Sequence, residues 1–523
     1  MTGTLALWRV FLRRDRWMLL WWSIGITILY WSQAVSVDGL YATQAEFDRA
    51  AALMDDNAAL VAMAGPARAL NTIGGQVTWQ ASAFGALAAG LMSMFIIGRH
   101  TRGEEESGRD ELTRATAVGR YAPMTAALLA AAVANLAVGL FVALSLVTYP
   151  LAAADSIGLG VGLALCGLAF SGTALVAAQL TSSTRSMYGI AGAVLGAAYA
   201  LRAVGDVGNE ALSWLTPIGW YQSMHAFSGL RWWPALLIAA GAGLAVVASY
   251  AVFARRDIGA GVFDARPGPA RAGRSLRSGL GLAWRLQRGA VIGWATGLFL
   301  TGLAYGSMGR DVEDLFGDSD TTREMFLQGG GDIVDAFYAT SVLMLAVIVC
   351  GFAISSAGRP RGEEERVHAE LLLATALPRR AWLAGHTAMT VLGSAVVLAA
   401  GGLGIGAGFA LVTGDGGAFV HLSLPILQYL PAVLVLSGVA RVLFGIAPRL
   451  MVLAWVPLVV VVVVMLFGEL FRMPQWVQDL SPFEHLALVP ARDVDWVPFL
   501  ALAALALLLS AAAHLTFDRR DLG

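Results

Sequence analysis

The chain has 523 residues, of which 57% are hydrophobic and only 14% charged, with a formal net charge of −1. A soluble domain carries roughly 25% charged residues, and one hydrophobic core stops growing at roughly 250 to 300 residues. The composition therefore argues against a soluble enzyme, and its high hydrophobicity excludes a disordered chain. The apolar surface must be buried mainly in a lipid bilayer.

Twelve nearly uninterrupted apolar runs are long enough to cross a bilayer, which takes about 20 helical residues. They cover residues 17–35, 81–98, 123–149, 157–180, 187–204, 234–254, 289–308, 337–357, 383–412, 424–446, 450–470 and 497–515. All 35 basic residues are arginines, and an alternating path from a cytoplasmic N-terminus places most of them inside. The positive-inside rule therefore predicts cytoplasmic N- and C-termini. The sequence predicts an all-α polytopic membrane protein.

The sequence repeats itself after about 260 residues, which divides the chain into two halves. Arg-Gly-Glu-Glu-Glu at 102–106 returns at 361–365, and the same spacing pairs Glu111-Leu112 with Glu370-Leu371. Arg-Arg-Asp at 255–257 returns at 519–521. These matches predict two six-helix halves, 1–258 and 284–523, joined by a polar Arg/Gly/Pro linker at 259–283. Because six is even, the repeat is parallel, and we expect the transport pathway between the halves.

The repeated acidic segments lie, in this topology, on the cytoplasmic side between the second and third spans of each half. Three glutamates, a polar turn and a Glu-Leu pair predict a short helix lying across the membrane face. A single acidic run is usually only a solvated surface. Its recurrence at the same place in both halves favours a surface that contacts a partner.

The segment 361–379, with its leucine-rich run and Thr375, resembles the first cytoplasmic loop of ATP-binding-cassette type-2 exporter permeases. In that family glutamates precede a Leu-Leu-x-Thr motif. The segment 102–120 is similar, but it lacks the leucine-rich run and has Gly119 in place of Pro378. With two six-helix halves in one chain, the sequence resembles the fused actinobacterial antibiotic and multidrug exporters of the tetronasin type.

This resemblance implies that the acidic segments are coupling helices, which dock into two copies of a separate ATP-binding subunit. ATP and Mg²⁺ would bind to those subunits, and this chain would hold no cofactor. The implied contact residues are Arg102, Gly103, Glu104, Glu105, Glu106 and Glu111, then Arg361, Gly362, Glu363, Glu364, Glu365 and Glu370, with Arg185 and Arg449 as secondary contacts. The exported molecules would be hydrophobic small molecules, such as antibiotics, drugs or lipids, leaving through the bacterial plasma membrane.

The resemblance also places the substrate pathway on the second and fifth helices of each half. Aromatic and methionine side chains suit varied apolar solutes because they repack without demanding fixed hydrogen bonds. In any membrane helix, however, each such residue more often packs against a neighbour or faces lipid. The candidates are Phe84, Met92, Phe95, Tyr188 and Tyr199 in the first half, and Phe337, Tyr338, Met344, Met451, Trp455 and Met465 in the second.

Residues for catalysis are not evident in the sequence. A Walker A loop needs a lysine on the phosphates, and the chain has none, so ATP hydrolysis would belong to separate subunits. The histidines are scattered, with no zinc-binding pair and no Gly-x-Ser-x-Gly elbow, which argues against a lipid-processing enzyme and predicts no catalytic or metal residues. Ionisable residues are rare in the spans, which disfavours the alternative of an ion-coupled secondary multidrug carrier. No nucleic-acid partner is expected.

Overall fold

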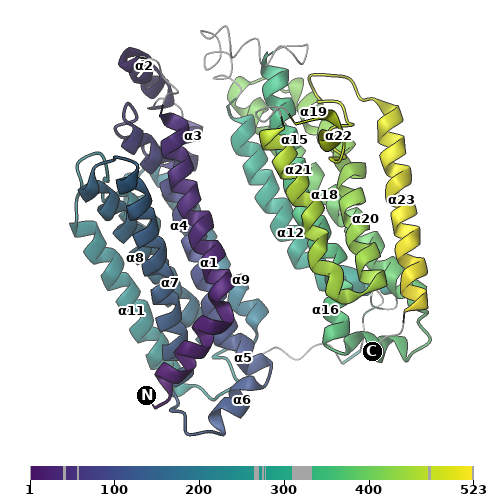
Figure 1. Ribbon diagram of the computed structural model, residues 1–523, viewed down its shortest axis with the longest axis horizontal. Helices are drawn as coiled ribbons and strands as arrows, with labels where there is room; N and C mark the ends of the chain where they lie inside the picture. Colours follow the sequence, from purple (N-terminus) through teal and green to yellow (C-terminus); the bar gives the residue numbers. More distant parts are fainter. Residues whose placement is uncertain are drawn as a thin grey trace. The chain divides into compact units, whose positions relative to one another are not determined.

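The computed structural model describes residues 2–38, 43–55, 58–263, 270, 271, 273, 276, 278–308, 333–468 and 473–520. Over these residues it contains α-helices and short 3-10 helices, and no strand (Figure 1). Twelve helical stretches are long and apolar enough to cross a membrane, and each overlaps one of the twelve predicted runs. The prediction of an all-α polytopic membrane protein with twelve spans is confirmed.

The chain forms two compact units, Met1–Gly268 and Pro269–Gly523, and the point of division lies within the polar segment 259–283. The first half has six long helices: α1 (Thr4–Val37), α4 (Ile73–His100), α7 (Ala122–Thr148), α8 (Ala153–Leu180), α9 (Thr184–Val207) and α11 (Trp233–Arg255). Short helices α2 (Gln44–Asp55) and α3 (Ala58–Ala64) connect α1 to α4, and η1 (Glu210–Leu215) and α10 (Pro217–Gln222) connect α9 to α11.

The second half also has six long helices, but its short connecting helices differ. Its long helices are α12 (Gly279–Gly306), α15 (Ile333–Ala357), α18 (Arg379–Thr413), α20 (Leu430–Ile446), α21 (Trp455–Phe467) and α23 (Trp496–Arg519). Shorter helices α19 (Ala418–Ser423) and η3 (Pro425–Tyr429) lead into α20, η4 (Pro448–Ala454) leads into α21, and α22 (Gln475–Gln478) follows it. Most of the acid-rich loop 309–335 lies outside the described residues.

The second and fourth spans form the core of each half. In the first half, the most apolar windows of the spans Ile73–Glu106 and Ala153–Leu180 are 72% buried, against 22% for Thr4–Val37. In the second half, Val334–Glu365 and Ala418–Ile446 are the most buried spans. The outer helices expose leucine, valine and tryptophan side chains, which is the arrangement expected where lipid replaces water as the solvent.

Glycines bring several of these helices into close backbone contact. A Cβ atom added at Gly160 of α8 would lie 2.3 Å from the carbonyl oxygen of Gly139 on α7. A Cβ atom at Gly404 of α18 would lie 2.2 Å from the carbonyl oxygen of Phe299 on α12. Side chains larger than hydrogen cannot fit at such distances, so these glycines allow the helices to pack closely.

Candidate functional site

Each acidic segment forms two short helices joined by a tight turn. In the first half these are α5 (Arg102–Glu106) and α6 (Arg109–Arg114), and in the second half α16 (Arg359–Glu365) and α17 (His368–Leu373) (Figure 1). The sequence predicts one short helix, but a residue with positive φ interrupts it. In the first half that residue is Gly108, with φ 72°. In the second half it is Val367, with φ 62°, which is equivalent to Gly108 in the repeat.

Val367 is strained, and this strain yields a prediction. The left-handed conformation costs a residue with a Cβ atom roughly 1–2 kcal/mol, and glycine avoids most of this cost. We therefore expect Val367→Gly to raise the unfolding free energy by about 1 kcal/mol, measured by thermal unfolding of the purified chain. Val367→Ala keeps the Cβ atom and should give no comparable gain. Equal stabilisation by both variants would contradict this explanation.

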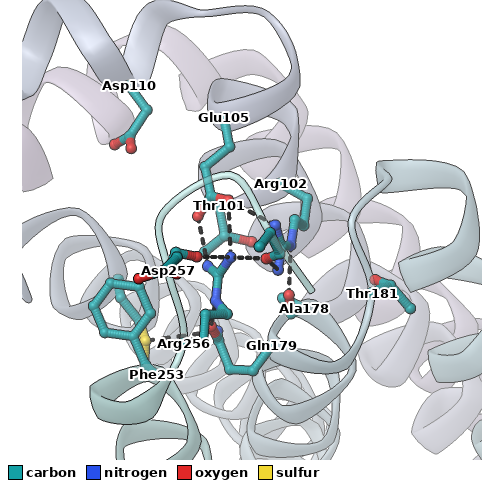
Figure 2. Close-up of polar contacts among 12 residues, drawn as sticks. Thr101, Arg102, Glu105, Asp110, Ala178, Gln179, Thr181, Phe253, Arg256 and Asp257 are labelled. Atoms are coloured by element: carbon teal, nitrogen blue, oxygen red, sulfur yellow. Dashed lines mark hydrogen bonds and ion pairs between the residues drawn. The ribbon is translucent and has the colours of Figure 1, made fainter. Parts of the chain in front are cut away.

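Glu105 is buried in a cluster of arginines at the start of the first acidic segment (Figure 2). Its carboxylate accepts hydrogen bonds from Arg102 Nη1 at 2.7 Å and from Arg256 Nη2 at 2.7 Å. Arg256 Nε also donates to Gln179 Oε1 at 2.9 Å. The side chains of Glu105 and Arg256 are only 9% and 3% exposed. Glu105 is therefore a structural anchor rather than an exposed docking residue.

Arg102 completes this cluster and is 1% exposed. Its Nη2 donates to the carbonyl oxygen of Ala260 at 2.8 Å, and its Nε donates to the carbonyl oxygen of Ala178 (Figure 2). These contacts tie α5 to the end of α8 and to the chain just after α11.

The second half contains an equivalent anchor. Glu364 of α16 forms an ion pair with Arg520, just as Glu105 does with Arg256. Arg520 lies 5.4 Å from the ring centre of Phe517, and Arg256 lies 5.3 Å from that of Phe253. We call the two pairs, Glu105–Arg256 and Glu364–Arg520, the anchor pairs.

The arginine that precedes the third span also makes the same contact in each half. Arg120 donates to the carbonyl oxygen of Arg256 at 2.9 Å, and Arg379 donates to that of Arg520 at 3.1 Å. The sequence repeat already paired both the glutamates and the Arg-Arg-Asp triplets. Because nothing in the sequence indicated that these two motifs touch, the anchor pairs were missed.

The remaining glutamates of the two runs also have partners within their own half. Glu104 pairs with Arg14 at 2.7 Å, and Glu106 accepts a hydrogen bond from the backbone amide of Thr184 at 3.1 Å, where α9 begins. Glu363 lies 3.6 Å from Arg359, and Glu365 lies 2.7 Å from Arg361. In the first half these partners lie on α1 and α9, whereas in the second half Glu363 and Glu365 pair with arginines of their own helix, α16.

Each segment exposes a Glu-Leu pair after the turn. Leu112 of α6 is 74% exposed and Leu371 of α17 is 71% exposed, and Glu111 and Glu370 beside them are also exposed. We call these two surfaces the Glu-Leu ridges. The sequence indicated the glutamates but not the leucines as contact residues, although the repeat contained both. A large exposed apolar side chain outside the spans is a common feature of protein interfaces.

The predicted secondary contacts lie beside the short helices. Arg185 is exposed at the start of α9, next to Thr184, which binds Glu106. Arg449 is exposed in η4, and a Cβ atom at Gly358, next to α16, would lie 3.2 Å from the side chain of Met451 in the same element. Gly103 and Gly362 lie inside α5 and α16.

The predicted pathway residues differ in exposure. Met92 and Tyr338 are fully buried, and Tyr338 donates to the carbonyl oxygen of Gly306 at 3.0 Å. Tyr199 donates to the carbonyl oxygen of Met63 at 2.6 Å and so holds the connection between α1 and α4. Met451 is buried, with 7% of its surface exposed. The remaining candidates are at least partly accessible within their own half: Phe84, Phe95, Tyr188, Phe337, Met344, Trp455 and Met465.

Over the described residues, no group of three or more histidine, cysteine, aspartate or glutamate side chains could hold a metal ion. Cys166 and Cys350 are both buried and unpaired, each inside a span. Among the described residues, both halves share the anchor pairs, the contact of Arg120 or Arg379 with the anchor arginine, and the Glu-Leu ridges.

Comparison with known proteins agrees with this architecture. Residues 276–518 match the family model described as the multidrug efflux system permease Rv1217c, C-terminal domain. Over its full length the chain is 40% identical to the multidrug efflux system permease protein Rv1217c of Mycobacterium tuberculosis, with 99% of this chain and 95% of that protein aligned. The chain is therefore a multi-pass membrane protein that belongs to this family of multidrug efflux system permeases.

Proposed function

We propose that this chain is the membrane-spanning part of an ATP-driven exporter, which moves hydrophobic small molecules such as drugs and antibiotics out of the cell. Separate ATP-binding-cassette subunits would bind ATP and Mg²⁺ and dock on the two Glu-Leu ridges. The chain would lie in the bacterial plasma membrane with both termini in the cytoplasm. It would act as a transport subunit of the type-2 exporter class and not as an enzyme.

One observation carries this proposal: the same short-helix pair, held by the same anchor pair, occurs in both halves and exposes the same Glu-Leu dipeptide. A motor outside the membrane can move the spans only through an element that contacts both. α5 and α16 meet this requirement because their anchor pairs reach the last span of each half. The family relationship supports drug efflux as the task.

The energy source is the first thing to test. Cells that express this chain together with a candidate ATP-binding subunit should export a fluorescent hydrophobic drug. A proton uncoupler should leave that efflux unchanged, provided that the cellular ATP concentration is held constant. Efflux should stop when the catalytic glutamate of the ATP-binding subunit is replaced. Efflux that the uncoupler abolishes while ATP remains plentiful would overturn the proposal and support an ion-coupled carrier.

A further inference from the structure

A cavity of about 430 Å³ opens beside the first acidic segment, between α1, α4, α5 and α9. Three arginines line it: Arg14, Arg99 and Arg109. Arg99 and Arg109 are 44% and 66% exposed, so their guanidinium groups retain donors that face solvent. The rest of the lining is largely apolar or uncharged and includes Met18, Phe95 and Tyr188.

Three carboxylates lie at or beside this cavity: Glu104, Asp15 and Glu106. Glu104 lies in the lining and pairs with Arg14 at 2.7 Å, with Arg109 at 4.0 Å. Asp15 is 2% exposed and lies behind the cavity, where it contacts Arg99 at 3.1 Å and the ring of His100. Glu106 accepts a hydrogen bond from the backbone amide of Thr184, which also lines the cavity. Arg99 and Arg109 are each paired with one carboxylate, but their guanidinium groups are partly exposed and keep further N–H donors that can bind an anion.

A second, apolar hollow of about 360 Å³ continues from this basic cavity along α1. The two share Met18, and the rings of Trp22 and Phe95, one from each lining, lie 6.3 Å apart. Trp21, Trp22, Gly25, Ile26, Leu29 and Ala88 form the remainder of the hollow. It contains no charged residue. Because residue 14 precedes residue 29 along α1, the hollow runs from the basic cavity toward the middle of the span.

The two solvent-facing arginines of this cavity do not recur in the second half. At the repeat spacing, the second half has Gly358 in place of Arg99 and His368 in place of Arg109. The anchor pairs and Glu-Leu ridges are common to both halves, whereas these two arginines are not. Residues required only for docking a pair of identical subunits would be expected in both halves, so we expect Arg99 and Arg109 to have a different task.

We propose that the basic cavity and the hollow beside it bind one anionic phospholipid of the cytoplasmic leaflet. The arginines take the phosphate, which they bind through paired N–H donors. An acyl chain lies in the apolar hollow, which Trp21, 67% exposed, leaves open to the surrounding lipid. The leaflet assignment rests on the proposed orientation of the chain, but the binding itself does not rest on the proposed ATP-driven transport.

The head-group contact is tested with the purified full chain in detergent, without nucleotide or partner. Native mass spectrometry would compare the retention of phosphatidylglycerol and phosphatidylcholine with identical acyl chains. The wild-type chain should prefer phosphatidylglycerol. Arg99→Gln combined with Arg109→Gln should weaken phosphatidylglycerol binding about thirtyfold, because each arginine near an anionic lipid contributes about a factor of five. Arg366→Gln, an exposed arginine of the second half, is the matched control.

The tail contact is tested with Gly25→Leu. Gly25 lines the hollow, and a Cβ atom at this position meets nothing within 4 Å, so the leucine side chain is expected to occupy the hollow. It should weaken phosphatidylglycerol binding about tenfold, since it takes the place of about two buried methylene groups. Gly293→Leu on α12 is the control, because a Cβ atom there also meets nothing within 4 Å.

The possible results separate cleanly. Selective loss in the two first-half variants, with both controls unchanged, supports the proposal. Equal binding of the two lipids by the wild-type chain, or full binding by Gly25→Leu, would overturn it. Because Gly25→Leu leaves every ion pair intact, it keeps the test decisive if the double arginine variant does not fold. The lipid-binding measurement does not involve transport. If drug efflux proved independent of ATP, the proposed function would fail, but the lipid-binding result would still stand.

Discussion

Replacing Arg256 with leucine is expected to be the most damaging single substitution at the candidate site. It leaves Glu105 buried with Arg102 as its remaining guanidinium partner and removes the link between α5 and the end of α11. Breaking a buried ion pair by removing one partner costs about 3 kcal/mol or more. We therefore expect a loss of about 3 kcal/mol in the unfolding free energy, measured by thermal unfolding in detergent.

The chain offers two matched comparisons for Arg256→Leu. Arg255 is the neighbouring residue and is exposed, so Arg255→Leu should change the stability little. Arg520→Leu breaks the equivalent pair of the second half, whose side chains are 16% and 14% exposed, and should cost about 1 kcal/mol because water screens that pair more. A loss for Arg256→Leu no greater than for Arg255→Leu would show that the first anchor pair does not hold α5.

Placing a charge on the Glu-Leu ridges should have the opposite effect, a loss of partner binding with the fold intact. Leu112→Asp and Leu371→Asp alter side chains that are more than two-thirds exposed, so the unfolding temperature should not change. A buried apolar anchor at an interface contributes about 2 kcal/mol or more, which predicts roughly thirtyfold weaker binding of the ATP-binding subunit at each ridge. Titration of that subunit against the chain in nanodiscs measures the affinity.

The control for this experiment lies in the turn after each ridge. Ala117 and Ala376 are equivalent in the repeat and both exposed, and replacing each with aspartate adds the same charge a few residues away. These variants should bind the subunit much more strongly than the leucine variants. If Leu112→Asp with Leu371→Asp binds the subunit as the wild-type chain does, the ridges are not the docking surfaces.

The sequence alone was sufficient to predict the membrane architecture. An apolar run long enough to cross a bilayer rarely adopts any structure other than a membrane-spanning helix. Because the two halves repeat, the spans predicted in one half could be compared with those predicted in the other. The same repeat correctly indicated that the acidic segments form short helices. The break between the two short helices was not predictable, because in the second half it occurs at Val367, a residue that rarely adopts positive φ.

The orientation of individual glutamates was likewise beyond prediction. Glu104, Glu105 and Glu106 follow one another, and their helix is too short for periodicity to show which of them faces inward. Glu105 is turned inward by Arg256, which is 151 residues away in the chain. Only the folded structure brings these two together. Family resemblance implies that the whole run makes contacts, whereas the structure shows that Glu105 and Glu364 are largely covered by their arginine partners while Glu106 and Glu365 are exposed.

The most direct test of the account is the accessibility of the ridges to a thiol reagent that cannot cross the membrane. Cys166 and Cys350 are buried, so labelling would report on Glu111→Cys and Glu370→Cys. Both positions should react in inside-out vesicles and not in intact cells, and adding the ATP-binding subunit should protect both. Labelling of either position in intact cells, or no protection by the subunit at either ridge, would contradict the account.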